Sequence, residues 1–275
     1  MAKITAAEVN KLRKQTGAGM MDCKKALVES EGDFDKAIQI LRKKGQKVAE
    51  ERGERDANEG VVIAGKKGTL AAMIVLNCET DFVAKNEDFI AVAKTILDVA
   101  LDQKPASVDE LKALKFDNEL TISEKITNEV GKIGEKIDLA ELSFVSSDNV
   151  IAYNHPGYKT AAIVALNKTG EEADAAGKNV AMQIAAMNPV ALDENSVSEE
   201  IKERELEIGR EQAKKEGKPD NIIDKIAEGK LKKYYQDNTL LNQQFFVDNK
   251  LSVAAYLKSI DKELTVTDFK RASLV

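Results

Sequence analysis

The sequence contains a single histidine and only two cysteines among its 275 residues. Cys23 and Cys78 are too few for a disulfide framework, and they lack the close spacing of metal ligands. The lone His155 has no second histidine with which to share a metal ion. These scarcities predict a reduced, cytoplasmic protein that holds no metal ion and no cofactor.

Long hydrophobic runs are also missing. No apolar segment approaches the roughly 18 residues of a membrane span, and the N-terminus lacks the apolar region of a signal peptide. The 41 Lys and Arg residues are interspersed with 47 Asp and Glu residues, which argues against a basic nucleic-acid surface. The sequence thus predicts a soluble protein that contacts neither nucleic acid nor a membrane directly.

Complete catalytic motifs are absent as well. The segment 60–67 has the glycine and lysine spacing of a phosphate loop, but it lacks the Ser or Thr for Mg²⁺ and consists of strand formers. The acids Glu79, Asp81, Glu87 and Asp88 could form a carboxylate metal site, although the helix dipole equally favours acids in a first helical turn. His155 is expected at a hairpin turn. It could be a solvated turn residue or a member of a Ser-His-Asp arrangement, and the spacing alone does not decide between these two roles. Nothing in these patterns requires an enzyme.

The first fifty-five residues predict three short helices. Thr5 and Glu8 have the spacing of a capping box, and the glycines at 17 and 19 separate the first helix from the second. Gly32 ends the second helix before a third one begins. The charged run 42–58 is expected to extend the third helix and to lead into the first strand.

A segment around 60–100 recurs, weakly, about ninety positions later. Leu70–Leu76 is a short apolar run that predicts a buried strand, and a strongly periodic helix follows it. Similar residues return at 161–166, again with a strand before them and a helix after them. Two copies of a β-hairpin plus helix predict a two-lobed α+β core.

The second copy is interrupted by a predicted antiparallel helical hairpin over 196–229. Segment 242–256 is expected to return to the core with Phe245, Phe246 and Val247, and 265–275 to form one last short helix. A helix is also expected to run from Thr121 towards Ile137, with glycines at 131 and 134 interrupting it. The expected domains are a three-helix bundle (1–55), core lobe 1 (56–145), core lobe 2 (146–195 and 230–262), the hairpin insert (196–229) and a C-terminal module (263–275).

The loop after the first apolar strand carries an unexplained aromatic residue. Asp81-Phe82 lies among polar neighbours, whereas the second copy has 168–172 at this place, with no aromatic residue. The repeated unit therefore does not require a phenylalanine there. Phe82 either packs under its own loop or projects as a contact residue, and we favour projection, because functional residues concentrate in such loops.

Two long motifs, 76–86 and 12–27, closely resemble the bacterial elongation factor Ts family, and the resemblance in domain order covers essentially the whole chain. It implies an N-terminal ubiquitin-associated-like bundle, a two-lobed α/β core with an inserted helical hairpin, and a C-terminal helical module. The activity it implies is guanine nucleotide exchange on the GTPase elongation factor Tu, without catalysis of a chemical reaction.

The resemblance also assigns residues to partner contacts. Asp81 and Phe82 match the pair that enters near the Mg²⁺ site of the GTPase, and His155 matches a core histidine that presses on the partner. The complete set of implied contact residues is Leu12, Arg13, Met20, Met21, Thr80, Asp81, Phe82, Val83, Ile133, Gly134 and His155. The chain departs from the family pattern after His155, at Pro156–Lys159, and at Gln244.

Two other functions compete with this interpretation. A ubiquitin-associated-type adaptor would use Met20 and Met21 as a peptide-binding patch, but it leaves Asp81 and Phe82 unexplained. A small-molecule enzyme would use His155 and the acidic loop. Whether two copies associate through the helical hairpin into a homodimer stays open.

Overall fold

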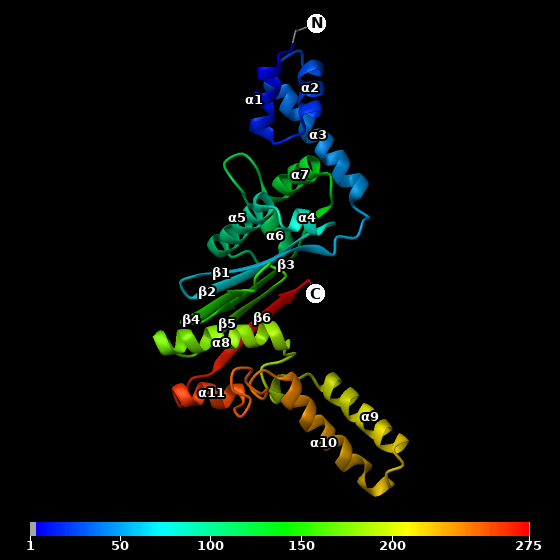
Figure 1. Ribbon diagram of the computed structural model, residues 1–275, viewed down its shortest axis with the longest axis vertical. Coiled ribbons are helices and arrows are strands. Elements are labelled where there is room, and N and C mark those ends of the chain that lie inside the picture. The colour runs from blue at the N-terminus through cyan, green and yellow to red at the C-terminus, as the bar shows by residue number, and fades with distance from the viewer. Residues whose placement is uncertain (1–3, 275) are drawn as a thin grey trace. The chain divides into compact units, whose positions relative to one another are not determined.

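The computed structural model describes residues 4–274, and Figure 1 shows its helices and strands in chain order. The chain divides into two compact units. The first combines the residues up to Ile63 with Ile74–Leu142 and Leu274, and the second combines Ala64–Met73 with Ser143–Ser273. The expected α+β class is confirmed. Residues 1–3 of the expected first domain and residue 275 of the expected tail lie outside the described residues.

The N-terminal bundle consists of α1 (Ala6–Thr16), α2 (Met20–Glu29) and α3 (Phe34–Arg52). The predicted capping box is present, because the Thr5 hydroxyl accepts from the Glu8 backbone N–H while the Glu8 carboxylate accepts from Thr5. The Asp33 side chain caps α3. Small and aliphatic side chains of all three helices fill the core, namely Val9, Leu12, Cys23, Ala26, Leu27 and Ala37. All three predicted helices are confirmed, and α3 extends into the charged run as far as Arg52, after which residues 53–58 lead into β1.

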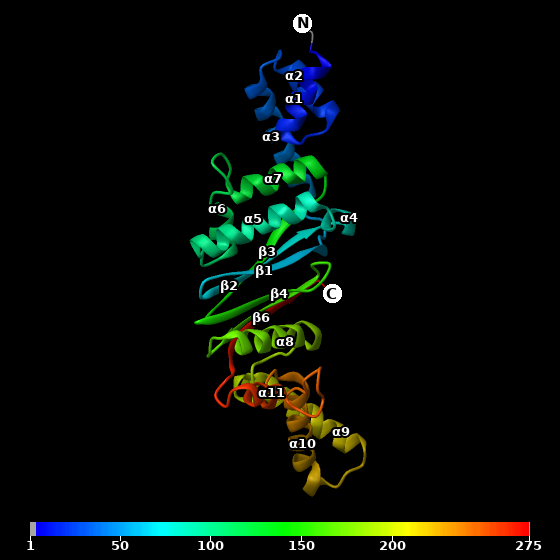
Figure 2. The ribbon, with the colours of Figure 1, turned by 60° about the vertical axis from the view of Figure 1, so that its left-hand side comes forward.

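The first sheet contains β1 (Glu59–Lys67), β2 (Leu70–Cys78) and β3 (Ile137–Ser146), with β2 in the centre. Between β2 and β3 the chain forms α4 (Asp81–Ala84), α5 (Glu87–Gln103), α6 (Val108–Ala113) and α7 (Ile122–Ile133). Both views show α5, α6 and α7 on one side of these strands (Figure 1, Figure 2). The periodic apolar face of α5, from Phe89 to Ala100, is buried as predicted.

The second sheet repeats this plan. It contains β4 (Asn149–Asn154), β5 (Thr160–Leu166) and β6 (Val266–Ser273), and the central β5 is antiparallel to both neighbours. Helix α8 (Glu171–Met187) packs on β4 and β5. A Cβ atom at Gly177 of α8 would lie 2.7 Å from side-chain atoms of Ile151 and Leu166, so a residue without a side chain permits this close packing. The predicted repeat of hairpin plus helix is thereby confirmed.

The inserted hairpin consists of α9 (Glu199–Lys215) and α10 (Asp220–Asn238), preceded by the short 3-10 turn η1 (Glu194–Ser196). The two helices bury small residues against each other, and a Cβ atom at Gly209 would lie only 2.9 Å from the Cα atom of Ala227. After the hairpin, α11 (Val253–Ile260) packs against α8.

Two sequence-based expectations are wrong in detail, those for the C-terminal tail and for the aromatic segment 245–247. The tail expected to be helical forms strand β6, because its residues pair with β5 over Thr160–Leu166. The helix predicted from Thr121 towards Ile137 is interrupted at Gly134, as expected: it ends at Ile133, because Gly134 adopts a left-handed conformation (φ 81°), and Ile137 opens β3. Of the aromatic segment expected in the core, Phe245 is buried, stacked on Tyr256 at 3.9 Å, but Phe246 and Val247 are exposed.

We expect Gly60→Ala to destabilise the protein by about 2–4 kcal/mol. Gly60 has a φ of 143°, and a Cβ atom there would lie 2.2 Å from the Leu76 carbonyl oxygen. The matched control is Gly68→Ala, where φ is 58° and no atom lies within 4 Å of the added Cβ. The control substitution should lower the free energy of unfolding by only about 1 kcal/mol, because alanine is strained in a left-handed conformation. Urea unfolding measures both values, and equal losses would contradict the steric argument.

We also expect a chain lacking 198–229, closed by a short glycine-serine linker, to keep a cooperative thermal transition. Within α9 and α10 the buried residues are Gly209, Ala213, Ile223 and Ala227, and Gly209 lies against Ala227 where the two helices pack together. Circular dichroism melting of the deleted chain tests this expectation. A matched control is Gly209→Val, which should separate α9 from α10 while the rest of the chain melts as before. Loss of the transition in the deletion would show that the hairpin belongs to a core.

Candidate functional site

The loop between β2 and α5 is longer than its counterpart in the second copy. Eight residues, 79–86, separate β2 from α5, whereas four residues, 167–170, separate β5 from α8. The additional residues form the single turn of α4. The buried Ala84 anchors this turn, and Val83 is half-buried. The repeated fold is therefore complete without α4.

Phe82 projects from this turn into solvent. It is 83% exposed, more than any other large hydrophobic side chain in the described part of the chain. Its neighbour Asp81 is half-exposed and accepts a hydrogen bond from the Lys85 ammonium at 2.6 Å. That bond raises the pKa of Lys85. The sequence-based preference for a projecting Phe82 is confirmed as far as its exposure is concerned.

Thr80 fixes the start of α4. Its hydroxyl donates to Glu135 at 2.7 Å, its backbone N–H donates to the same carboxylate at 3.0 Å, and its hydroxyl oxygen caps the Val83 N–H. The left-handed Gly134 turns the chain at the end of α7, so that Glu135 follows directly beside the loop. The structure thus brings Thr80 together with Glu135, the residue that follows Ile133 and Gly134.

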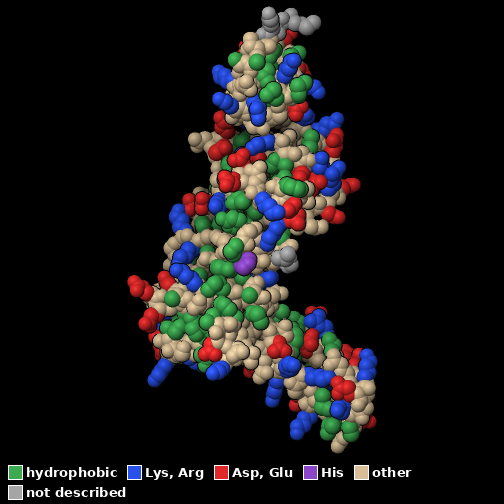
Figure 3. Space-filling view, in the orientation of Figure 1, with side chains coloured by type: hydrophobic (Ala, Val, Ile, Leu, Met, Phe, Trp, Pro, Cys, Tyr) green, Lys and Arg blue, Asp and Glu red, His purple; other side chains and the backbone are tan. Residues whose placement is uncertain are grey.

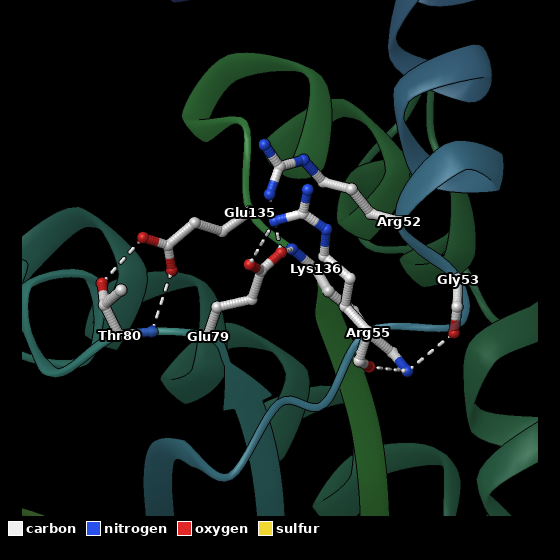
Figure 4. Close-up of polar contacts among 7 residues, drawn as sticks. All are labelled: Arg52, Gly53, Arg55, Glu79, Thr80, Glu135 and Lys136. Carbon is white, nitrogen blue, oxygen red and sulfur yellow. Dashed lines mark hydrogen bonds and ion pairs between the residues drawn. The ribbon is translucent and has the colours of Figure 1, made fainter.

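Glu79, the residue before Thr80, accepts charge-assisted hydrogen bonds from three donors. The Arg52 guanidinium donates to it at 2.8 Å, the Arg55 guanidinium at 3.3 Å, and the Lys136 backbone N–H at 2.6 Å (Figure 4). The Lys136 N–H, followed by the two arginines, lowers the pKa of Glu79. The carboxylate is therefore ionised at neutral pH and ties the loop to α3. Sequence reasoning missed this role, because none of the three partners is close to Glu79 along the chain.

The remaining candidate residues lie elsewhere. Arg13, Met20 and Met21 are exposed on the N-terminal bundle, and Met20 and Met21 are adjacent at the start of α2. Leu12 is fully buried in the bundle core, as the periodicity of α1 predicts, so it presents no surface of its own. Lys132 of α7 lies beside Gly17, which places the bundle next to α7.

His155 belongs to the second unit, where it is exposed in the turn between β4 and β5. Its Nδ1 atom lies 3.0 Å from the Tyr153 hydroxyl, and its backbone pairs with Thr160 and Tyr158. The turn depends on the left-handed conformations of Gly157 and Tyr158. Figure 3 shows the histidine side chain at the surface. The hydrogen bond between Tyr153 and His155 holds the imidazole ring in one orientation on the turn.

Other kinds of site find little support within residues 4–274. No three His, Cys, Asp or Glu side chains in this range converge as metal ligands would. Asp81 lies in the first turn of α4, and Glu87 and Asp88 lie in that of α5, where the helix dipole accounts for acids. None of the helices described in this range is both long and apolar enough to cross a membrane. Basic and acidic side chains alternate over the face in Figure 3, as the composition indicates.

Comparison with known proteins agrees with this arrangement. Residues 79–274 match the family model described as elongation factor TS. The chain is 52% identical over 277 residues to elongation factor Ts of Christiangramia forsetii, with both chains fully covered. Similar matches are elongation factor Ts of Amoebophilus asiaticus (52% identity, 98% of each chain) and of Cytophaga hutchinsonii (50%, all of each chain).

These matches define a translation elongation factor, and the α+β fold is consistent with that class. The chain belongs to the elongation factor Ts family.

We expect Glu79→Gln to lower the free energy of unfolding at pH 7 by about 1–3 kcal/mol, because a largely buried set of charge-assisted bonds loses its anion. The folded-state pKa of Glu79 is lowered, so its contribution is present above the ordinary value of 4.5 and is lost as the pH falls through the folded value. Urea unfolding at pH 7 and pH 4 measures the difference between the two chains. That difference should be smaller at pH 4, and a larger difference there would contradict the assignment.

Proposed function

We propose that this chain binds the GTPase elongation factor Tu and accelerates the release of GDP, so that GTP can bind in its place. The observation that carries the proposal is Phe82, an aromatic side chain that is 83% exposed on a loop fixed by Thr80 and Glu79. An exposed ring on a fixed support is suited to insertion into another protein, because little conformational freedom is lost on binding.

The mechanism requires no covalent step by this chain. An exchange factor binds the empty GTPase more tightly than the nucleotide-bound form, and linkage makes this antagonism reciprocal. In the proposal, Phe82 enters between helices of the GTPase near its Mg²⁺ site, and Asp81 brings a negative charge close to it. The half-exposed carboxylate of Asp81, which is paired with Lys85, lies on the same turn as Phe82.

Magnitudes indicate that Phe82 does not act alone. Weakening nucleotide affinity a thousandfold requires about 4 kcal/mol of coupling, whereas burial of one phenylalanine contributes roughly 1.5–3 kcal/mol. Other contacts must supply the difference. Arg13, Met20 and Met21 offer a docking surface on the bundle, which Leu12 supports from inside. In our proposal Val83, Ile133 and Gly134 contact the GTPase together with Phe82. His155 provides a further contact from the second unit.

The competing functions explain less of the geometry. An adaptor that binds through Met20 and Met21 would leave the exposed Phe82, and the bonds that fix its loop, without a function. An enzyme centred on His155 would require a partner for general acid–base chemistry, and the Nδ1 atom of His155 instead faces Tyr153. Loss of an activity in His155→Ala, measured without any partner protein, would favour that enzyme.

We expect Phe82→Ala to keep the melting temperature while slowing chain-stimulated GDP release roughly tenfold to hundredfold, the equivalent of the lost burial energy. Stopped-flow release of fluorescent GDP from elongation factor Tu measures the rate. Ile208→Ala, which truncates another exposed apolar side chain on α9, is the matched control and should leave the rate unchanged. A chain that does not accelerate release at all, before any substitution, would end the proposal.

A further inference from the structure

The C-terminal end of α3 meets the Phe82 loop in a polar cluster. Figure 4 shows the guanidinium groups of Arg52 and Arg55 directed at the Glu79 carboxylate. Arg52 bonds one carboxylate oxygen at 2.8 Å and Arg55 bonds the other at 3.3 Å. Glu79 immediately precedes the Thr80 that starts α4. The loop that carries Phe82 is therefore tied to a helix that begins in the N-terminal bundle.

Lys136 closes this cluster from a third direction. Its backbone N–H donates to Glu79, and its ammonium donates to the carbonyl oxygens of Gly53 and Arg55, each at 2.8 Å. One residue thus holds both the loop and the chain that leaves α3. We name Arg52, Arg55, Glu79 and Lys136 the Glu79 clasp.

Burial makes the Glu79 clasp different from an ordinary surface ion pair. The side chain of Glu79 is only 16% exposed and that of Arg52 27% exposed. An exposed pair contributes little because water screens it. A largely buried carboxylate with three donors is held much more strongly, and removal of one partner leaves an incompletely compensated charge.

Helix α3 is fixed at a second point along its length. Near its middle, the backbone of Gly45 contacts that of Gly131 on α7 so closely that a Cβ atom at Gly131 would lie 2.7 Å from the Gly45 Cα atom. The first turns of α3 belong to the bundle core through Ala37. One helix of 19 residues, about 28 Å long, therefore connects the bundle, α7 and the Glu79 clasp.

We infer that the Glu79 clasp positions Phe82 and couples the N-terminal bundle to it. Arg52, Arg55, Glu79 and Lys136 are positioning residues: they orient the ring before any partner binds, so that docking by the bundle delivers Phe82 in one geometry. The kinetic part of this inference rests on the proposed function. A disrupted clasp leaves the docking surface intact, so the maximal rate of GDP release falls while the half-saturating concentration changes little.

The first test is a double-mutant cycle of Arg52→Gln and Glu79→Gln in the full chain. We expect each single variant to lower the maximal rate of GDP release from elongation factor Tu threefold to tenfold, with less than a twofold change in half-saturating concentration. The double variant should be no slower than the worse single variant, because both remove the same contact. Lys47→Gln, which breaks an exposed pair with Glu51 on the same helix, is the matched control and should behave as the unmodified chain.

A second measurement needs no partner. The chain has no tryptophan, so Phe82→Trp introduces a single indole as a reporter of the loop. In the free protein, Arg52→Gln or Glu79→Gln should increase the fast component of the indole anisotropy decay, whereas Lys47→Gln should not. Should Glu79→Gln fail to fold, Arg52→Gln retains the Arg55 and Lys136 bonds to Glu79 and carries the test alone.

Independent rate effects of Arg52→Gln and Glu79→Gln, together with an unchanged anisotropy decay, would overturn the inference. A larger half-saturating concentration at an unchanged maximal rate would overturn it too, because the clasp would then serve docking. If even the unmodified chain fails to accelerate GDP release, the proposed function falls, and the anisotropy decay still decides whether the clasp orders Phe82.

Discussion

Hydrogen bonds to two carboxylates, those of Glu79 and Glu135, fix the loop on which the exposed aromatic ring stands. An exposed phenylalanine in water gains nothing from its position, so its orientation must come from the backbone beneath it. The Glu135 carboxylate accepts hydrogen bonds from the backbone N–H and the hydroxyl of Thr80. The Glu79 carboxylate accepts hydrogen bonds from Arg52 of α3 and from the backbone N–H of Lys136. These bonds are strong because they are charge-assisted and partly buried.

The internal repeat shows what the chain added to its basic plan. Each copy consists of a β-hairpin and a helix, and each receives a third strand from later in the chain, β3 in the first sheet and β6 in the second. Only the first copy inserts α4 between strand and helix. A feature that one copy carries and the other folds without is an addition to the fold, and this addition holds Asp81 and Phe82.

Local sequence patterns predicted most of the fold. Thr5 and Glu8 form the predicted capping box because the two residues lie three positions apart, a spacing that the helix itself fixes. The buried strand at 70–76 and the periodic face of α5 followed from hydrophobic patterns in the same way. Within the candidate site, the comparison of the two copies identified Phe82 as a residue that the repeat does not need.

The sequence by itself determined most of the helices and strands, since these depend on neighbours within a few positions. Comparison of its two internal copies, about ninety residues apart, also identified Phe82 as an aromatic residue that the repeated unit does not need. Only the tertiary structure decided that the tail becomes strand β6, because its partner strand β5 lies about a hundred residues earlier. It likewise decided that Phe246 is exposed while Phe245 is buried. The bonds of Glu79 to Arg52 and Lys136 span 27 and 57 residues, distances over which no local pattern carries information.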